Sequence, residues 1–314
     1  MTVGPLVPVV QLHPPGKHAE RLGHGAAKVR RRPAAGRGDI NPVEPIAAVV
    51  RFVIRRRIGS LEPGADLRLV LGAAGHDEGH NSSVTPAEEE VRAERLLDAQ
   101  KKAAQLFDEI EQRAMIRPGV GEQQLSDEIH HLAGEMFGVT RHWHRRIVRA
   151  GENTLQPFRE RPPDRVIGNN DIVFLDLGPI FEEWEADFGR TFLLSDEPDK
   201  KAVRDALPRV WQAGREYFDR HPDVTGAELF DFVVGAAHAE GFEFGGSIAG
   251  HLVGEFPHKK IAGTGVEWYI MPGSDKPMRR TDPSGRRCHW ILEIHLVDRV
   301  RGFGGFYEQL LDLP

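Results

Sequence analysis

Residues 172–178, with the sequence IVFLDLG, set the carboxylate of Asp176 inside a strongly apolar stretch. An ionised carboxylate in a hydrophobic strand is costly unless a partner or a metal ion neutralises it. Four more apolar stretches carry a group of this kind: WEADFGRTF (184–192) with Asp187, AGHLVGEF (249–256) with His251, WILEIHL (290–296) with Glu293 and FGGFYEQLL (303–311) with Glu308. Four carboxylates and one imidazole form an oxygen-rich donor set that suits a pair of divalent cations.

The first two stretches predict a strand pair. Ten residues separate Asp176 from Asp187, about the length that a hairpin needs to bring both side chains to one end. Because side chains alternate along a strand, Phe174 and Asp176 share a face. We predict two strands across residues 171–194, joined by a tight turn near 181–184.

Helix signals surround this strand pair. Thr85, Pro86 and Glu88 have the spacing of a capping box with proline in the first turn, and apolar residues then recur near helical spacing until Arg117-Pro118-Gly119. A second amphipathic helix is predicted over about residues 125–136. Two more helices are expected over residues 199–218 and from 225 to near 241, where Thr225 and Glu228 repeat the capping spacing.

Further strands are predicted at about residues 250–254, 266–271, 289–299 and 303–312. The order helix pair, strand pair, helix pair, strand group is a doubled α+β pattern in one domain of roughly 230 residues. We place this domain at residues 85–314.

The composition is that of a soluble globular protein, with 40% hydrophobic and 28% charged residues among 314. A net charge of -6 argues against a nucleic-acid partner, and no apolar run is long enough to span a membrane. Cys288 is the only cysteine, which excludes an intrachain disulfide and a cysteine metal cluster. We expect a cytoplasmic protein in which this lone cysteine is inert rather than nucleophilic.

Residues 1–84 differ in kind from the rest. They are rich in arginine, glycine and proline and show little sustained period. We interpret them as a disordered extension, with a small packed element or an organelle-targeting arm as the alternatives. The prolines in VGPLVPVV (3–10), with no basic region before them, argue against a secretory signal.

From about Glu88 to the C-terminus the chain resembles the pita-bread metallopeptidases: methionine aminopeptidases, Xaa-Pro aminopeptidases, prolidases and their relative creatinase. The matching motifs are FLDLG, EADFGRTF, GHLVGEFPH, LEI and YEQ, in this order and at fitting spacing. The resemblance implies a pita-bread fold with two pseudo-symmetric halves, each a helix pair plus strands, forming a curved and mostly antiparallel sheet. A homodimer is common in this family.

The resemblance also implies metal ligands. Asp176 would chelate one ion, Asp187 and Glu308 would bridge both, and His251 and Glu293 would hold the second. The implied cofactors are two divalent ions, with Mn, Co, Fe and Zn as candidates.

The same resemblance implies a catalytic role for His258, seven residues after His251. It would lie beside the substrate carbonyl and stabilise the tetrahedral intermediate. On physical grounds we expect Glu293 or its neighbour to relay a proton from the attacking, metal-bridging water to the leaving amine.

The chain departs from the family in three ways. The histidine that contacts substrate some twenty residues before the first aspartate is missing, and Gln156, Arg159 or the triplet His142-Trp143-His144 are the candidate replacements. Ile294 and His295 follow Glu293 where the family commonly has proline, so His295 would lie on the face of Glu293 and support it or bind substrate. Residues 1–85 are too short and irregular for the α/β domain that precedes the catalytic part of prolidase-like members.

These observations favour a dinuclear hydrolase of small peptides or small amides, an aminopeptidase or dipeptidase of the Xaa-Pro type. A creatinase-like hydrolase of a non-peptide C–N bond and a non-catalytic binding protein on the same fold are the alternatives. A purely structural alternative for the five polar groups is a set of buried salt bridges. Arg190, Arg299 and Arg301 are close enough in sequence to pair with them.

Overall fold

The computed structural model describes residues 84–257 and 265–313. The extension predicted for residues 1–84 therefore lies outside the described residues, apart from its last position, and His258 lies outside them too. Within the described ranges, no helix combines the length and the apolar character needed to cross a membrane.

The described strands form two sheets. The larger contains β1 (Ile147–Ala150), β2 (Ile172–Leu177), β5 (Phe188–Leu193), β6 (Glu243–Phe244), β7 (Gly250–Val253), β8 (His289–Asp298) and β9 (Phe303–Leu310). Its order is β1-β2-β5-β9-β8-β6, β7 also pairs with β8, and each pairing is antiparallel. The smaller is a hairpin of β3 (Ile180–Phe181) and β4 (Trp184–Glu185), at the predicted turn.

Four long helices match the predicted ones: α2 (Pro86–Gln112), α3 (Glu122–Phe137), α4 (Pro198–Arg220) and α5 (Gly226–Ala239). Both predicted capping boxes are present. The hydroxyls of Thr85 and Thr225 accept from the backbone N–H of Glu88 and Glu228, and each glutamate accepts from the threonine N–H. Gly138, with a φ of 70°, ends α3 in the left-handed region that glycine tolerates best.

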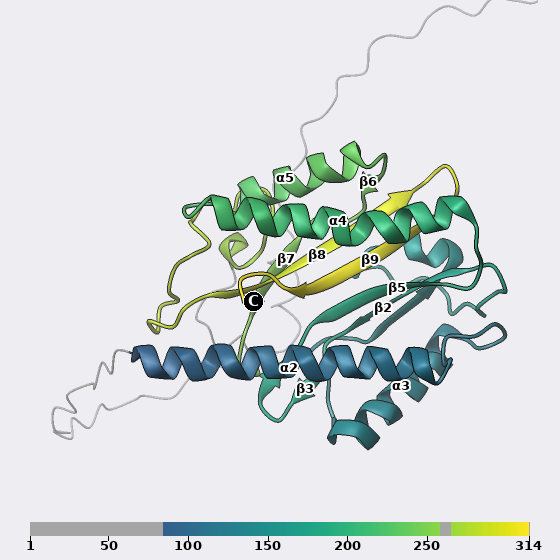
Figure 1. The fold of residues 1–314 in the computed structure, drawn as a ribbon, viewed down its shortest axis with the longest axis horizontal. Coiled ribbons are helices and arrows are strands. Elements are labelled where there is room, and N and C mark those ends of the chain that lie inside the picture. Colours follow the sequence, from purple (N-terminus) through teal and green to yellow (C-terminus); the bar gives the residue numbers. More distant parts are fainter. Residues whose placement is uncertain (1–83, 258–264, 314) are drawn as a thin grey trace, which may run out of the picture. The chain divides into compact units, whose positions relative to one another are not determined.

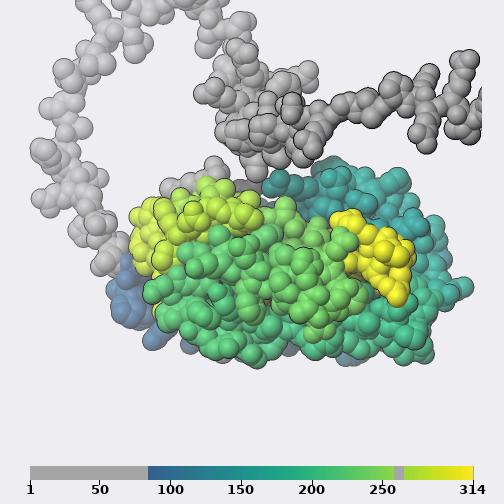
Figure 2. Space-filling view, turned by 90° about the horizontal axis from the view of Figure 1, so that it is seen from above, coloured from purple at the N-terminus to yellow at the C-terminus, as the bar shows by residue number. Residues whose placement is uncertain are grey.

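Each helix pair covers its own part of the sheet (Figure 1). Leu106 of α2 and Ile129 of α3 are buried with Leu175 of β2. The second helix pair packs on β8, where the indole N–H of Trp211 in α4 donates to the carbonyl of Leu292 at 3.0 Å. Figure 2 shows α4 and α5, in green, covering most of one side of the described domain. The two helix-plus-strand halves agree with the sequence prediction.

The alternation of β8 explains where a site can form. Trp290 and Leu292 face α4 and α5 and are fully buried in their core. Glu293 and His295 point the other way, because neighbouring side chains on a strand lie on opposite faces. The polar groups of the strands thus lie on the face that the second helix pair leaves open.

One predicted strand is wrong. Residues 266–268 form the 3-10 helix η4 (Val266–Trp268), and Tyr269 makes only an isolated bridge with His251. The aromatic and β-branched residues favoured a strand, but hydrogen bonds from Trp268 N to Gly265 O and from Tyr269 N to Val266 O turn the chain locally instead. The short strands β1 and β6 were not predicted.

Candidate metal centre

A cavity of about 790 Å³ lies on the open face of the sheet. Its lining includes all five side chains that the sequence predicted as metal ligands, namely Asp176, Asp187, His251, Glu293 and Glu308. The expectation that strands far apart in sequence bring these groups together therefore agrees with the structure.

Three of the carboxylates lie in one row across the sheet. Asp176 of β2 pairs with Gly189 of β5, Gly189 pairs with Glu308 of β9, and Glu308 pairs with Glu293 of β8. Directly opposed residues of antiparallel strands project to the same face. The row therefore aims its carboxylates at a common space.

Gly189 leaves room for this row. A Cβ atom at this position would lie 2.6 Å from the ring of Phe306 and 3.1 Å from the Cβ of Glu308. A side chain on the middle strand would thus displace the carboxylate next to it. The glycine two residues after Asp187 is a structural requirement of the site.

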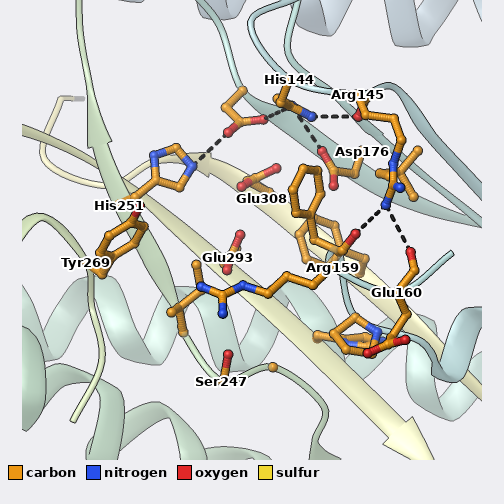
Figure 3. A pocket seen from close by; sticks show the side chains of 18 of the residues that line it. His144, Arg145, Arg159, Glu160, Asp176, Ser247, His251, Tyr269, Glu293 and Glu308 are labelled. Atoms are coloured by element: carbon orange, nitrogen blue, oxygen red, sulfur yellow. Dashed lines mark hydrogen bonds and ion pairs between the residues drawn. The ribbon is translucent and has the colours of Figure 1, made fainter. Parts of the chain in front are cut away.

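Asp187 lies at the centre of the cluster, between two imidazoles. Its Oδ2 is 3.0 Å from Nε2 of His251, and its Oδ1 is 3.1 Å from Nε2 of His144. Nε2 of His144 is also 3.4 Å from Oδ1 of Asp176. Figure 3 shows the two histidines on opposite sides of the carboxylate cluster, with Glu308 close to both.

Potential ligand atoms gather in two overlapping groups. One group is His144, Asp176 and Asp187, and the other is Asp187, His251 and Glu308; within each, the atoms lie within 4.8 Å of one another. Asp187 belongs to both groups. A residue shared in this way is suited to bridge two ions.

The three arginines that the sequence suggested as salt-bridge partners bind elsewhere. Arg190 donates to the backbone carbonyl of Glu308 and to Gln309, while Arg299 pairs with Glu243 and Arg301 with Asp199 and Asp298. Among the described residues, none of these three arginines forms an ion pair with Asp176, Asp187, Glu293 or Glu308, while Asp176 and Asp187 pair with histidines instead.

Burial and mutual repulsion make the charged forms of three of the four carboxylates unfavourable. Burial, followed by the charges of Asp187 and Asp176, raises the pKa of Glu308 well above its ordinary value. Burial also raises the pKa of Asp176 and of Glu293 to about 7. The pKa of Asp187 is lowered against the effect of burial, because two imidazoles lie beside it.

Two observations test whether divalent cations fit. Oε2 of Glu308 is buried and has no hydrogen-bond partner among the described residues. Buried polar atoms are seldom left so, because an unsatisfied acceptor costs about 1–3 kcal/mol. The donors around it are carboxylate oxygens and imidazole nitrogens, which are ligands of Mn, Fe, Co and Zn. The residues present therefore fit a metal centre.

The other predicted site residues have mixed outcomes. Gln156 and His295 line the cavity, but Nε2 of His295 lies 2.8 Å from the carbonyl of Thr154 and supports that turn rather than Glu293. His142 does not line the cavity, and its ring packs on His130 instead. The reason is geometric, since His142 lies outside the carboxylate cluster while His144 reaches it.

Arginines fix the loop on the other side of the cavity. Arg145 donates to the backbone carbonyls of Phe158 and Glu160, and Arg149 donates to those of Pro157 and Glu160. Arg159 itself lines the cavity and extends across it toward Glu293 (Figure 3). The loop is thus held by its backbone, while one guanidinium enters the site.

The sequence did not reveal how Trp143 and His144 join the centre. The ring of Trp143 packs on those of His144 and His251, at centroid distances of 4.4 and 5.1 Å. The missed signal is the short apolar run of β1, which pairs with β2 and opposes Ile147 to Asp176. A strand predicted there, paired with β2, would have placed His144, which precedes it, near the end of β2 that contains Asp176.

Comparison with known families agrees with this geometry. The sequence profile of metallopeptidase family M24 matches residues 94–280. Among curated proteins, a sequence comparison finds no match.

Solved structures share the fold. An X-Pro aminopeptidase from Thermotoga maritima is similar with a TM-score of 0.56 at 20% identity, over 72% of this chain and 58% of that one. A prolidase from Thermococcus sibiricus is similar with a TM-score of 0.53 at 22% identity, over 73% of this chain and 61% of that one. An Xaa-Pro dipeptidase from Bacillus anthracis is similar with a TM-score of 0.54 at 21% identity, over 71% of this chain and 57% of that one. This chain thus spans about three fifths of each, and the likeness confirms the pita-bread fold.

Proposed function

Because the chain belongs to metallopeptidase family M24, we propose that it is a metal-dependent hydrolase of small peptides, acting as an aminopeptidase or dipeptidase of the Xaa-Pro type. One observation carries this proposal. Asp187 lies between two imidazoles, next to a row of carboxylates that form no ion pair with an arginine among the described residues. Bound cations would compensate the charge of such a group of buried anions.

We assign the metal ligands as the sequence suggested: Asp176, Asp187, His251, Glu293 and Glu308. Two divalent ions, when bound there, supply the Lewis acidity that activates water and polarises the scissile carbonyl. Mn, Co, Fe and Zn all suit a mixed oxygen and nitrogen donor set.

The remaining chemistry belongs to side chains of the cavity. Glu293 is the least buried of the four carboxylates, so it is placed to take a proton from the attacking water and pass it to the leaving amine. Trp268, Tyr269 and Phe158 line the cavity with Glu293 and offer apolar surface for a substrate side chain. His258, which lies outside the described residues, keeps its proposed role beside the carbonyl.

Arg159 takes the place of the substrate-contacting histidine that the family pattern led us to expect. It enters the cavity from a loop fixed by Arg145 and Arg149, and no ion pair or hydrogen bond of its side chain is recorded among the described residues. A guanidinium in this position suits a carboxylate of the substrate, such as the free C-terminus of a dipeptide. The same feature favours a second candidate function, hydrolysis of a non-peptide C–N bond in a small anionic molecule.

The test joins metal analysis to a substrate panel. Elemental analysis of the purified protein should find close to two divalent ions per chain, and Xaa-Pro or Xaa-Ala dipeptides should be cleaved after addition of Mn²⁺ or Co²⁺. Asp187→Asn should lower kcat at least about a hundredfold, since even residues behind a metal ligand cost 10–100-fold when replaced. Asp127→Asn, at a surface carboxylate paired with Arg146, is the matched control.

Three results would contradict the proposal in different parts. Undiminished activity in Asp187→Asn would remove the metal mechanism. A metal-loaded protein that leaves every dipeptide intact but hydrolyses small C–N substrates would shift the assignment to the second candidate. A protein with no affinity for divalent ions would leave only a binding role for this fold.

A further inference from the structure

His144 and His251 approach the two oxygens of Asp187 in the same way. Nε2 of His251 is 3.0 Å from Oδ2, and Nε2 of His144 is 3.1 Å from Oδ1. His144 adds a 3.4 Å approach to Asp176. We propose, building on the metal-dependent function above, that His144 is a ligand of the ion held by Asp176 and Asp187, so that each half of the centre contains one imidazole.

The protons of the two rings are placed alike. Nδ1 of His144 is 2.7 Å from the backbone carbonyl of Arg145, and Nδ1 of His251 is 2.8 Å from that of Leu252. A carbonyl only accepts hydrogen bonds, so Nδ1 carries the proton in both rings. Metal-binding histidines typically donate their other N–H to a carbonyl or carboxylate in this way, which fixes the tautomer and the ring orientation.

With Nδ1 bonded to a carbonyl, Nε2 faces the carboxylate oxygens, where it either donates a second proton to them or, without that proton, binds a cation through its lone pair. A cation between this lone pair and the carboxylates attracts both. Two ligands bound to one ion at about 2.0–2.1 Å are separated by about 3–3.4 Å. The distances from His144 to Asp187 and Asp176 fall in this range.

Protonated imidazoles alone do not resolve the charge of the cavity. Even if both rings were imidazolium ions, two of the four carboxyl groups around them would still have to take up a proton before the cluster is neutral. Oε2 of Glu308 would still have no hydrogen-bond partner among the described residues. The side chain of His144 is only 6% exposed, so water does not compensate the cluster there.

The fold makes specific room for this ring. A Cβ atom at Gly178 would overlap the ring of His144, so the glycine permits the ring to lie against the end of β2. Trp143 packs against the same ring and donates its indole N–H to the carbonyl of Ala186. These contacts hold His144 in position, as expected for a ligand rather than a mobile surface histidine.

An imidazole in each half changes the expected metal preference. Carboxylate-only sites suit Mg and Mn, imidazole donors suit Zn, Fe and Ni, and Co²⁺ generally binds a given site more strongly than Mn²⁺ does. We therefore expect the centre to hold Co²⁺ or Zn²⁺ more strongly than Mn²⁺ at both positions. Replacing His144 should weaken that preference at one position only.

The test is a titration of the metal-free full chain with Co²⁺, followed by calorimetry and by visible absorption. His144→Ala should lose one of the two bound equivalents, or bind it at least about tenfold more weakly, and its Co²⁺ absorption bands should change. His144→Asn, of similar polarity, repeats the test if the alanine variant folds poorly. His142→Asn, two residues away and outside the cavity lining, is the control and should match the wild type.

Unchanged stoichiometry, affinity and absorption in both His144 variants would overturn the inference and assign the ring to substrate contact or to an ion pair. This result is distinct from failure of the proposed function. If the proposed function fails, the wild-type chain itself binds no divalent ion or cleaves no substrate, whatever residue occupies position 144.

Discussion

Glu293 and Glu308 lie directly opposite each other on β8 and β9, so two carboxylates share one face of the sheet without an intervening arginine. Like charges in opposed positions destabilise a strand pair. The metal-free domain therefore carries a local conflict that a bound cation relieves. The two glutamates that are expected to bind metal therefore lower the stability of the metal-free protein, and this cost can be measured.

Glu308→Gln should stabilise the metal-free protein, because the amide is neutral without a bound proton, whereas the buried carboxyl group must either take up a proton or carry a charge. We expect a gain of about 1–2 kcal/mol, or a rise in Tm of about 2–8 °C for a domain of this size. The variant should lose the further rise in Tm that Mn²⁺ or Co²⁺ gives the wild type. Thermal unfolding with chelator and with added metal measures both effects.

The same pair predicts how the gain depends on pH. Burial raises the pKa of Glu308 above its ordinary value of 4.5, so between these two pKa values the folded state binds more protons than the unfolded one. Stability of the metal-free wild type then falls as pH rises through this window. The advantage of Glu308→Gln should be absent below pH 4.5 and grow above it. An advantage that shrinks with rising pH would contradict this cause.

The exposed pair of Glu243 and Arg299 supplies the control. Glu243→Gln removes a charge from the same sheet, but in contact with solvent, where an ion pair contributes about 0–1 kcal/mol. It should leave the metal-induced rise in Tm unchanged. Equal effects of the two substitutions would show that general sheet stability, not the opposed carboxylates, is being measured.

Gly189→Ala should damage the centre without removing any ligand. The new Cβ would meet the ring of Phe306 at 2.6 Å and the Cβ of Glu308 at 3.1 Å. We expect a loss of about 1–3 kcal/mol in stability, as for overpacked positions, together with weaker metal binding. Denaturant unfolding and metal titration measure the two effects separately.

Gly235→Ala is the matched substitution in α5, where a Cβ would meet nothing within 4 Å. It should stabilise the domain by about 0.5–1 kcal/mol through helix propensity and leave metal binding intact. If Gly189→Ala behaved in the same way, the glycine in the carboxylate row would have no special role.

Much of this fold could be read from the sequence because local signals agreed with the tertiary structure. Capping boxes at Thr85 and Thr225 set the starts of two helices, and apolar strands with single acidic groups set the order of the ligands. The strand prediction for residues 266–268 was wrong for the opposite reason, because local turn hydrogen bonds outweighed the strand propensity of these residues.

The position of His144 could not be read in the same way. It depends on a four-residue strand, β1, whose pairing with β2 is set by contacts between segments about 25 residues apart. It also depends on Gly178, whose missing side chain matters only because a ring from another segment lies there. Contacts between distant segments decide such positions, and propensities do not report them.

Arg159→Gln should raise KM for substrates with a free carboxylate and leave kcat largely unchanged. Loss of a charge-assisted hydrogen bond costs about 1.5–3 kcal/mol, or roughly 10- to 150-fold in KM. The matched substrate is the same dipeptide with an amidated C-terminus, which should show little difference between wild type and variant. Equal losses with both substrates would show that Arg159 acts on the cavity in general and not on the carboxylate.

Cys288 should be unreactive in the folded protein. It is 6% exposed, its N–H donates to the carbonyl of Arg280, and burial raises its pKa to about 11. At pH 8 about one thiol in a thousand is then ionised, and the thiolate is the reactive form. A thiol reagent should label the native protein at least about a hundredfold more slowly than the urea-unfolded chain. Rapid labelling of native protein, with loss of activity that substrate prevents, would instead place this cysteine in the chemistry.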